Sequence, residues 1–494
     1  MKLNRIAIYT LAGALLMGAP ACDDFLELEP ISEATTENAY KSASDAEAAL
    51  TGVYESFQAE YYIWDNLVFS EILSDNYYAG GDNAEIFAVD NVAITPTNSR
   101  LWNNWSQIYN AIAKANVVLQ KVPQITDPQL SETRKNQILG EAAFLRAYHY
   151  FQLVKMWGGV PLVLEPVTSL DPATTQKPRA TEVEVYNQIV TDLTFALENR
   201  LPDTFGENAS VNKARATRGA ANALLAKAWA QRPDRDYNKV LQYADAVINS
   251  PAGYQLLGNF NDLFDGAHYN NAESIMEVQF IGGNEANWGP QMLLPPSLSG
   301  DTWRKFMTPS HDLVNAYNSE NDNVRRNTTI LFENAPWSDE FWSVSTGGSV
   351  PFAYRWKSAN GWASTNRQYL FRLADIMLLK AEALNELGRL EEARTVLNTV
   401  RRRVNLGVNT STTKEEMRMA ILKERRLELA QEGHRWDDLR RYGVAAQVMN
   451  SLNEIDLRTN TRKEYNVAPH ELFLPIPQSE INRNPQLTQT QGYN

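Results

Sequence analysis

Residues 373–404 read LADIMLLKAEALNELGRLEEARTVLNTVRRRV, and this stretch decides the fold class. Its apolar and small residues recur every three or four positions, before Gly388 and again after it. A glycine that follows such a stripe is typical of a helix end. The stretch therefore predicts two antiparallel helices joined by a short turn. The first carries Leu370, Ala374, Met377, Ala381 and Leu384 on its inner face, and the second carries Leu390, Ala393, Leu397, Val400 and Val404.

This helix pair resembles a tetratricopeptide repeat, in which small residues seat one helix against its partner. A looser pair is predicted at 212–231 and 237–248, where alanines are frequent. No strict repeat period runs through the chain, so a pure repeat array is excluded. The same periodicity predicts further helices at 44–58, 105–121, 138–157 and, after the capping-box residues Thr413 and Glu416, to about 431.

The middle and the end of the chain have a different pattern. Residues 250–367 are rich in Gly, Pro, Asn, Ser and Trp, and they predict loops with a few short strands, one of them at 274–280. Three prolines predict an extended tail over 471–494. We expect a mostly α fold in which residues 22–494 form a single domain. Its helical scaffold lies mainly at 40–250 and 368–445, and its loop-rich region at about 250–367.

Composition excludes several classes of function. The 494 residues include 46 basic and 59 acidic side chains, a formal charge of −13, with no basic block to bind nucleic acid. One cysteine excludes an internal disulfide and a zinc site with two thiolates. The histidines are far apart, and no phosphate-binding, dinucleotide or GxSxG motif is present. We expect neither a cofactor nor a metal.

The N-terminal residues indicate export. Lys2 and Arg5 precede a short apolar run, which predicts a signal peptide over 1–21. The following Cys22 resembles the lipidated residue of a bacterial lipoprotein, and the acidic pair after it resembles a surface-export signal of Bacteroidetes. Cleavage before Cys22 leaves 44 basic against 59 acidic residues, a formal charge of −15. We expect attachment to a membrane through lipid only.

Several blocks, in the same order and at the same spacing, resemble the SusD/RagB family of Bacteroidetes surface lipoproteins. The blocks are CDDFLELEP at 22–30, RAYHYFQLV at 146–154, WGGVP at 157–161, RLADI at 372–376, AEALN at 381–385, VRRR at 400–403, ERRLEL at 424–429, EGHRWDDLRR at 432–441, FLPIP at 473–477 and EINRNP at 480–485. They span the chain from end to end, and only the 280–367 region matches weakly.

The resemblance implies a starch-utilisation-system type of nutrient-binding lipoprotein. Such a protein has tetratricopeptide-like helix pairs on one side and a variable, loop-rich ligand-binding half on the other. It lies on the outer membrane, exposed at the cell surface, and partners a SusC-like TonB-dependent transporter. It captures an oligosaccharide or polysaccharide as a hinged lid and breaks no bond.

The charged segment 424–441 has two interpretations. Its acidic residues are carboxylates of the kind that catalysis uses. Its arginines are close enough in sequence to neutralise those acids, and buried charges must be paired. Because the family uses this segment as framework, we interpret it as a buried ion network.

Tryptophans indicate where a ligand binds. Twelve tryptophans over 494 residues would place about two in any window of 75, but six lie in 288–362. Flat aromatic faces stack on sugar rings, although large rings also form small cores under loops. From this window we select Trp288, Trp303, Trp337 and Trp342 as ligand-binding candidates.

A second aromatic cluster lies nearer the N-terminus. Its candidates are Trp64, Tyr77, Tyr78 and Trp102, with the polar residues Asp75, Asp82 and Asn83. Asp75 is carried over from the family, whose corresponding loop has an acidic residue. Asp82, Asn83 and Trp102 follow from chemistry and proximity alone. Aspartate and asparagine also form turns and caps beside glycine, which is the structural alternative.

Two other functions remain open. An α-helical glycoside hydrolase needs two carboxylates facing an aromatic cleft, and Asp301, Asp339 and Glu340 lie among the tryptophans. The same kind of lid captures peptide in some family members, for which a longer and less aromatic cleft is expected.

Overall fold

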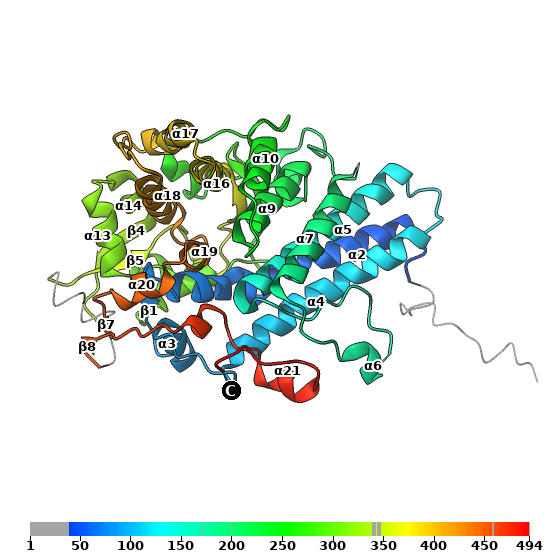
Figure 1. Ribbon diagram of the computed structural model, residues 1–494, viewed down its shortest axis with the longest axis horizontal. Coiled ribbons are helices and arrows are strands. Elements are labelled where there is room, and N and C mark those ends of the chain that lie inside the picture. Colours follow the sequence, from blue (N-terminus) through cyan, green and yellow to red (C-terminus); the bar gives the residue numbers. More distant parts are fainter. Residues whose placement is uncertain are drawn as a thin grey trace, which may run out of the picture.

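The computed structural model describes residues 39–169, 171–198, 200–337, 342, 347–456 and 459–493. The predicted signal peptide and Cys22 lie outside these residues. Within them the fold is mostly α with a few short strands, as the sequence predicts (Figure 1). No helix among the described residues combines the length and apolar character that a membrane span requires.

One group of helices comes from the N-terminal part of the chain. Helix α5 packs against α4 and α7, and α2 contacts both α4 and α5 (Figure 1). Helix α5 is buried around most of its circumference, as its apolar pattern predicts. It ends at Gly158, whose φ of +68° suits glycine. The bounds are α2 Ala43–Tyr54, α3 Ala84–Asp90, α4 Ser99–Lys121, α5 Glu132–Trp157, α6 Pro172–Thr175 and α7 Glu182–Leu197.

A second group contains the helix pairs that the opening stretch predicts. Helix α16 lies between α10 and α17, and α18 covers its other side. The predicted helix at 212–231 is two helices, because the chain is extended at Arg215 and Thr217. The bounds are α8 Ala209–Ala214, α9 Arg218–Gln231, α10 Tyr237–Ile248, α16 Leu373–Glu386, α17 Leu390–Arg403, α18 Lys414–Leu429, α19 Arg435–Arg441 and α20 Ala445–Asn450.

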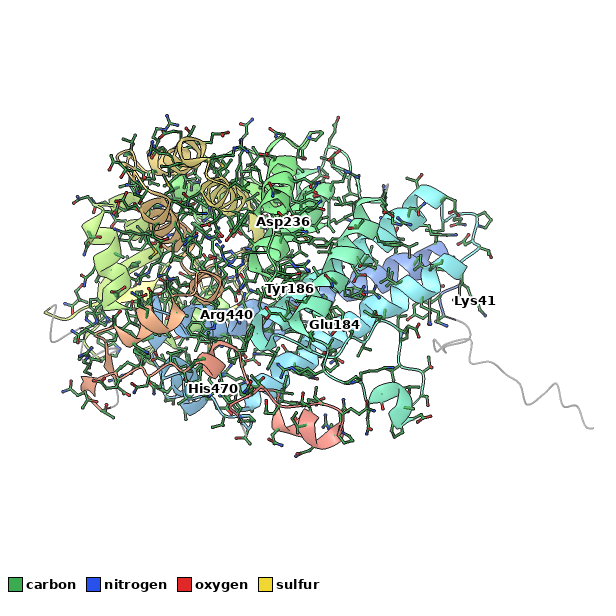
Figure 2. All side chains as sticks on the ribbon, viewed as in Figure 1. Lys41, Glu184, Tyr186, Asp236, Arg440 and His470 are labelled. Atoms are coloured by element: carbon green, nitrogen blue, oxygen red, sulfur yellow. The ribbon has the colours of Figure 1, made fainter. Side chains whose placement is uncertain are left out.

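The predicted periodicity corresponds to a real core. Leu378, Ala381, Leu384, Ala393, Leu397, Val400, Met417 and Ile421 form one buried cluster between α16, α17 and α18. Thr413 caps α18 in the predicted capping box with Glu416. Between the two groups of helices the space is filled by side chains, among them Tyr186 and Arg440 (Figure 2).

The described residues contain four antiparallel strand pairs, three of which have a strand in the loop-rich region, and that region has more helix than predicted. Strand β1 pairs with β3, β2 with β6, β4 with β5, and β7 with β8. Helix α13 was not predicted; Ser310 caps it, and Leu313, Val314 and Tyr317 are its buried stripe. The bounds are β1 Tyr77–Ala79, β2 Ser274–Val278, α11 Gly289–Leu293, α12 Pro296–Ser299, β3 Met307–Pro309, α13 His311–Ser319, α14 Asn323–Thr329, β4 Ile330–Asn334, β5 Ser349–Ala353, β6 Gln368–Arg372, β7 Ile455–Asp456 and β8 Thr461–Arg462.

Short helical turns complete the fold. The tail is not extended throughout, because α21 forms between Pro477 and Asn484. Two π-helical turns, η3 and η4, follow the 3₁₀ turn η2. The bounds are η2 Glu55–Gln58, η3 Tyr61–Asp65, η4 Val68–Ile72, η5 Val122–Gln124, η6 Phe260–Leu263, η7 Asn360–Trp362, η8 Pro469–Leu472 and α21 Gln478–Arg483.

Segment 424–441 is a buried ion network, as interpreted from the sequence. Glu428 is fully buried and pairs with Arg372, Arg403 and Arg325. Arg425 pairs with Asp375 and Asp438 at 2.8 Å each. Paired charges of this kind hold helices in a fixed orientation, and their carboxylates do not face solvent.

Candidate functional site

A surface cleft of about 530 Å³ opens in the loop-rich half. Its lining is aromatic and apolar with two charged groups: Gly81, Asp82, Met292, Trp303, Arg304, Phe306 and Trp362. We call these seven residues the cleft. A larger groove of about 840 Å³ between α2 and α4 has one aromatic residue, Tyr40, in its lining. The cleft is therefore the better match to a ligand with flat rings.

The cleft is assembled from distant parts of the chain by the β1–β3 pair. Tyr77 pairs with Pro309 and Ala79 with Met307. Beyond this pair Gly80 donates its N–H to the carbonyl of Phe306 at 3.0 Å. A Cβ at Gly80 would lie 1.9 Å from the carbonyl oxygen of Lys305, so only glycine permits this approach. The approach brings Gly81 and Asp82 beside Trp303 and Phe306.

Trp303 is held from beneath by a buried cation. The Lys305 Nζ lies 4.0 Å from the centroid of the indole ring. Lys305 is buried, and it donates to Asp301, to the Gln291 carbonyl and to the Ser299 hydroxyl. Burial lowers the pKa of Lys305, although Asp301 opposes that shift. This cation fixes one face of Trp303, and the ring also borders the cleft.

Trp362 lines the same cleft, and its backbone is strained. Its side chain is 49% exposed, and its φ is +75°. Asn360 and Gly361 before it also have positive φ values, of +46° and +57°. A bulky residue in this region costs about 1–3 kcal/mol, and such strain clusters at ligand-binding sites. The fold thus holds a large apolar ring in solvent at an energetic cost.

The structure brings some of the sequence candidates to the cleft. Asp82 and Trp303 line it. Trp64 is buried below, and the centroid of its ring lies 6.3 Å from that of Phe306. Trp337 lies beside the cleft, and its Nε1 donates to the Thr302 carbonyl at 3.1 Å. Asn83 caps α3 through its side-chain oxygen.

The other candidates lie elsewhere or are buried. Tyr77 and Tyr78 are buried in β1. Trp342 is buried and stacks on His311 with centroids 3.8 Å apart. Trp288 is half-buried against the main core, directly before α11. Trp102 lies on α4, where its Nε1 donates to Glu480 of α21 at 3.2 Å.

Asp75 has a structural environment. It is buried, and Arg435 donates to both of its carboxylate oxygens at 2.7 and 2.8 Å. Burial alone would raise the pKa of Asp75, but Arg426 and Arg435 hold it at about 2. The ion pairs of Asp75 with Arg426 and Arg435 join the segment after η4 to α18 and α19. The carboxylate of Asp75 does not line the cleft.

The sequence candidates omit five of the seven cleft residues, Gly81 and four with side chains. Trp362 lies in the tryptophan window, and Asn360-Gly361 before it marks a turn, but no local pattern shows that the positive φ continues to Trp362. Phe306 and Arg304 flank the buried Lys305, and Met292 lies on the short helix α11. Aromatic residues at 303 and 306 are the one local signal that would have added Phe306.

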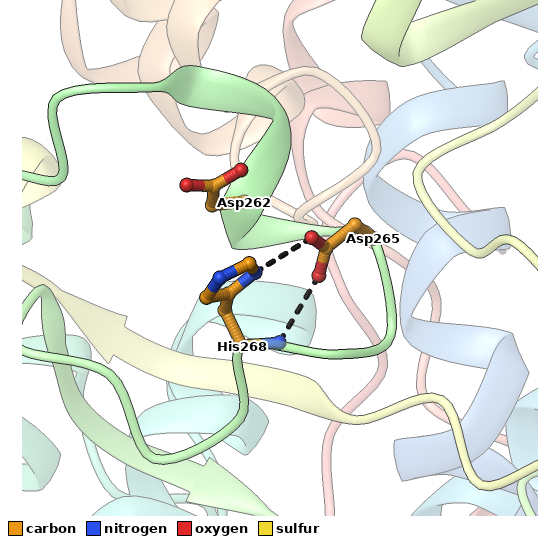
Figure 3. A group of neighbouring side chains, drawn as sticks. All are labelled: Asp262, Asp265 and His268. Carbon is orange, nitrogen blue, oxygen red and sulfur yellow. Dashed lines mark hydrogen bonds and ion pairs between the residues drawn. The ribbon is translucent and has the colours of Figure 1, made fainter.

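One group of side chains outside the cleft has the composition of a metal site. Ligand atoms of Asp262, Asp265 and His268 lie within 4.8 Å of one another (Figure 3). Asp265 already accepts from the N–H of Ala267 and of His268, and from His268 Nδ1 at 2.6 Å. These bonds account for the arrangement as a turn, and we assign no metal to it.

The described residues of the cleft do not supply a pair of carboxylates for hydrolysis. Among the described lining residues Asp82 is the one carboxylate. Asp301 pairs with Lys305 beneath Trp303. Asp339 and Glu340 lie outside the described residues. The lining thus has the parts for stacking and hydrogen bonding, and one of the two groups that glycoside hydrolysis uses.

Comparison with known proteins places the chain in a family. A family model described as "SusD family" matches residues 334–493, and one described as "Starch-binding associating with outer membrane" matches residues 24–229. SusD-like protein P38 of Formosa agariphila is 30% identical over 489 residues, which cover 92% of this chain and 94% of that protein. The starch-binding protein SusD of Bacteroides thetaiotaomicron is 23% identical, with 84% and 83% covered.

Solved structures agree with the sequence relatives. A laminarin binding SusD-like protein superposes with a TM-score of 0.74 at 28% identity, over 92% of this chain and 100% of that one. The likeness covers both groups of helices and the loop-rich half. With relatives of this similarity along nearly its whole length, and with the sequence blocks in the expected order, the chain belongs to the SusD/RagB family.

Proposed function

We propose that this protein is a non-catalytic, surface-exposed lipoprotein that captures a glycan and delivers it to a SusC-like TonB-dependent transporter in the outer membrane. The observation that carries the proposal is the cleft that Trp362 and Trp303 both line. Trp362 is half-exposed on a strained backbone, and Trp303 is fixed by Lys305. Exposed rigid aromatic rings gain most when a flat apolar face covers them.

The ligand is a carbohydrate with exposed ring faces. Asp82 and Arg304 at the cleft supply a carboxylate and a guanidinium for hydroxyl groups. The relative at 28% identity that is described as laminarin binding supports this class of ligand, and so do the starch-binding names in the family. Laminarin and starch are therefore the first glycans to try.

The transporter and the anchor rest on the family and on the N-terminal sequence. Cys22 with its acidic neighbours supports a lipid anchor at the cell surface, and the family supports the SusC-like partner. The ligand would shift the equilibrium between the open and closed states of the lid only by the difference between its binding free energies for the two states.

Affinity gels test the binding function. The mature protein without residues 1–22 is run through native gels cast with laminarin, amylopectin and other soluble polysaccharides. The same mixtures are assayed for new reducing ends. We expect retardation by at least one polysaccharide, no new reducing ends, and loss of retardation in Trp362→Ala.

The outcomes separate the parts of the proposal. New reducing ends would overturn the non-catalytic assignment. No retardation by any polysaccharide would contradict glycan binding and favour peptide capture. Retardation that survives in both Trp362→Ala and Trp303→Ala would place the site outside the cleft.

A further inference from the structure

Half-exposed apolar side chains continue past the cleft. Trp337 is 52% exposed, Phe332 is 38% exposed and Leu298 is 37% exposed. We call these three residues the platform. Leu298 lies on α12, Phe332 lies on β4, and Trp337 lies on the turn that follows β4. A fold does not need large apolar groups in solvent, and exposed patches of this kind mark binding surfaces.

The platform is continuous with the cleft through the backbone. The Trp337 Nε1 donates to the carbonyl of Thr302, and Trp303 is the next residue. Two consecutive Cα atoms are about 3.8 Å apart, so the indole of Trp337 begins close to the backbone of a cleft residue. Helix α12, which carries Leu298, contacts the turn η7, which carries Trp362. The platform and the cleft are thus two parts of one surface.

The platform is held in place by several hydrogen bonds. Ser297 of α12 donates its N–H and its hydroxyl to Glu333 of β4. Strand β4 is in register with β5 over five residue pairs, from Ile330 with Ala353 to Asn334 with Ser349. The hydrogen bond from Nε1 restrains the orientation of the Trp337 ring. Rigid rings lose little conformational entropy on binding.

We propose that the glycan path extends from the cleft onto the platform, so that the site binds an internal stretch of a long chain. The inference deepens the proposed glycan function and rests on it. Trp337 stacks on sugar units beyond those between Trp303 and Trp362. The exposed Thr302 and Asn334 lie beside the platform and offer hydroxyl and amide groups to them. A short oligosaccharide fills the cleft alone, and a polymer also covers the platform.

Isothermal titration with one glycan at three lengths tests the path. The first series is laminaribiose, laminarihexaose and laminarin, because of the relative at 28% identity. If another polysaccharide retards the protein in the gels, the series is the disaccharide, the hexasaccharide and the polymer of that glycan. The variants are Trp337→Ala and Trp362→Ala. Trp102→Ala is the matched control, since Trp102 is 38% exposed and bonded through Nε1 but lies on α4.

We expect Trp337→Ala to weaken binding of the hexasaccharide and the polymer about tenfold, as for one lost aromatic contact, and to leave the disaccharide within about twofold. Trp362→Ala weakens all three lengths, and Trp102→Ala weakens none. Trp337→Phe restores most of the affinity for the long ligands. Melting curves of all variants verify that they are folded.

Three other results would overturn the inference, and they are distinguishable. If Trp337→Ala binds every length like the wild type while Trp362→Ala fails, the path ends at the cleft and the proposed function stands. If Trp337→Ala weakens all lengths equally, Trp337 acts by supporting the cleft. If the wild type binds no polysaccharide, the proposed function fails together with the path.

Discussion

At the scale of single residues, the backbone of Trp362 lowers stability while its ring serves the proposed glycan binding. Its φ of +75° is a conformation that glycine adopts freely and that other residues adopt at a cost. Alanine at this position keeps the strain and loses the ring, and glycine loses both. We expect Trp362→Gly to be more stable than Trp362→Ala by about 1 kcal/mol, although both lose glycan binding.

Urea unfolding of the two variants measures this difference in the free energy of unfolding. Gly361→Ala is the companion test, because Gly361 has a φ of +57° and a Cβ added there would meet no atom within 4 Å. It introduces strain without a clash and should lower stability by a similar amount. Equal stability of Trp362→Gly and Trp362→Ala would show that the turn is not strained.

His149 predicts a pH dependence of stability. It lies fully buried in α5, where its Nδ1 is hydrogen-bonded to the Tyr62 hydroxyl. Burial lowers its pKa from 6.5 to about 3, and Lys114 adds to the shift. Between these values the unfolded chain binds a proton that the folded chain does not bind. The free energy of unfolding therefore falls as the pH is lowered, by at most about 1.4 kcal/mol per pH unit from this residue.

The comparison with His149→Gln isolates this contribution. Glutamine does not titrate, so the variant should lose stability less steeply than the wild type between pH 6 and pH 4. Other buried acids titrate in both proteins and cancel in the difference. Stability curves that stay parallel across this range would contradict a neutral buried His149.

How far the cleft was predictable from sequence depends on which contacts are local. Trp303 and Asp82 were selected because aromatic and acidic residues clustered near them. Trp64 was selected for the same reason, but it is buried, and the ring of its neighbour Phe306 comes from far along the chain. The β1–β3 pairing joins residues more than 200 positions apart, and no local pattern encodes it. Exposure of a tryptophan is set by such distant contacts, so composition alone did not separate Trp362 from Trp342.

At the scale of elements, helices were predicted best where small and apolar residues recur without interruption at helical spacing. The pair α16 and α17 has that pattern, and one buried cluster contains five of its predicted residues, Ala381, Leu384, Ala393, Leu397 and Val400. The boundary between α8 and α9 was missed because alanine favours helix on both sides of the break at Arg215 and Thr217. Helix α13 was missed because it is short and surrounded by turn residues, although Ser310 is a good N-cap.

The strands of the loop-rich region depend on buried charge for their placement. Arg372, at the end of β6, donates to Glu428 and to Glu432 at 2.7 Å each and to Glu273 at 3.0 Å. It is 1% exposed. Arg403 also pairs with Glu273 and Glu428, but among the described residues Arg372 is the one cation that all three acids share, and its removal leaves them close together with less positive charge. We expect Arg372→Met to lower the free energy of unfolding by about 3–5 kcal/mol.

A matched surface variant controls for the loss of an arginine. Arg389 pairs with Glu392 three residues away, and both side chains are exposed. Arg389→Met should lower the free energy of unfolding far less than Arg372→Met does, because water and salt screen an exposed ion pair. Urea denaturation followed by circular dichroism compares the two. A small effect at both positions would mean that the network does not hold β6 against α18.

At the scale of the whole molecule, the proposed lipid attachment and the proposed ligand binding belong to separate segments. The cleft is built from residues 81–362, and no described helix is suited to span a membrane. In the proposed function, membrane association belongs to Cys22, which precedes the described residues. We expect Cys22→Ser to move the full-length protein from the membrane fraction to the soluble fraction of its host, with an unchanged affinity for the glycan.

Fractionation with antibody detection, followed by affinity gels on the soluble variant, measures both parts of this prediction. Loss of glycan affinity together with the anchor would mean that the N-terminal segment contributes to the site. A variant that stays in the membrane fraction would have a second attachment, and the acidic chain with its formal charge of −13 is not suited to bind anionic headgroups. Retention would then identify a protein partner in the membrane, and the SusC-like transporter would be the first to examine by co-purification.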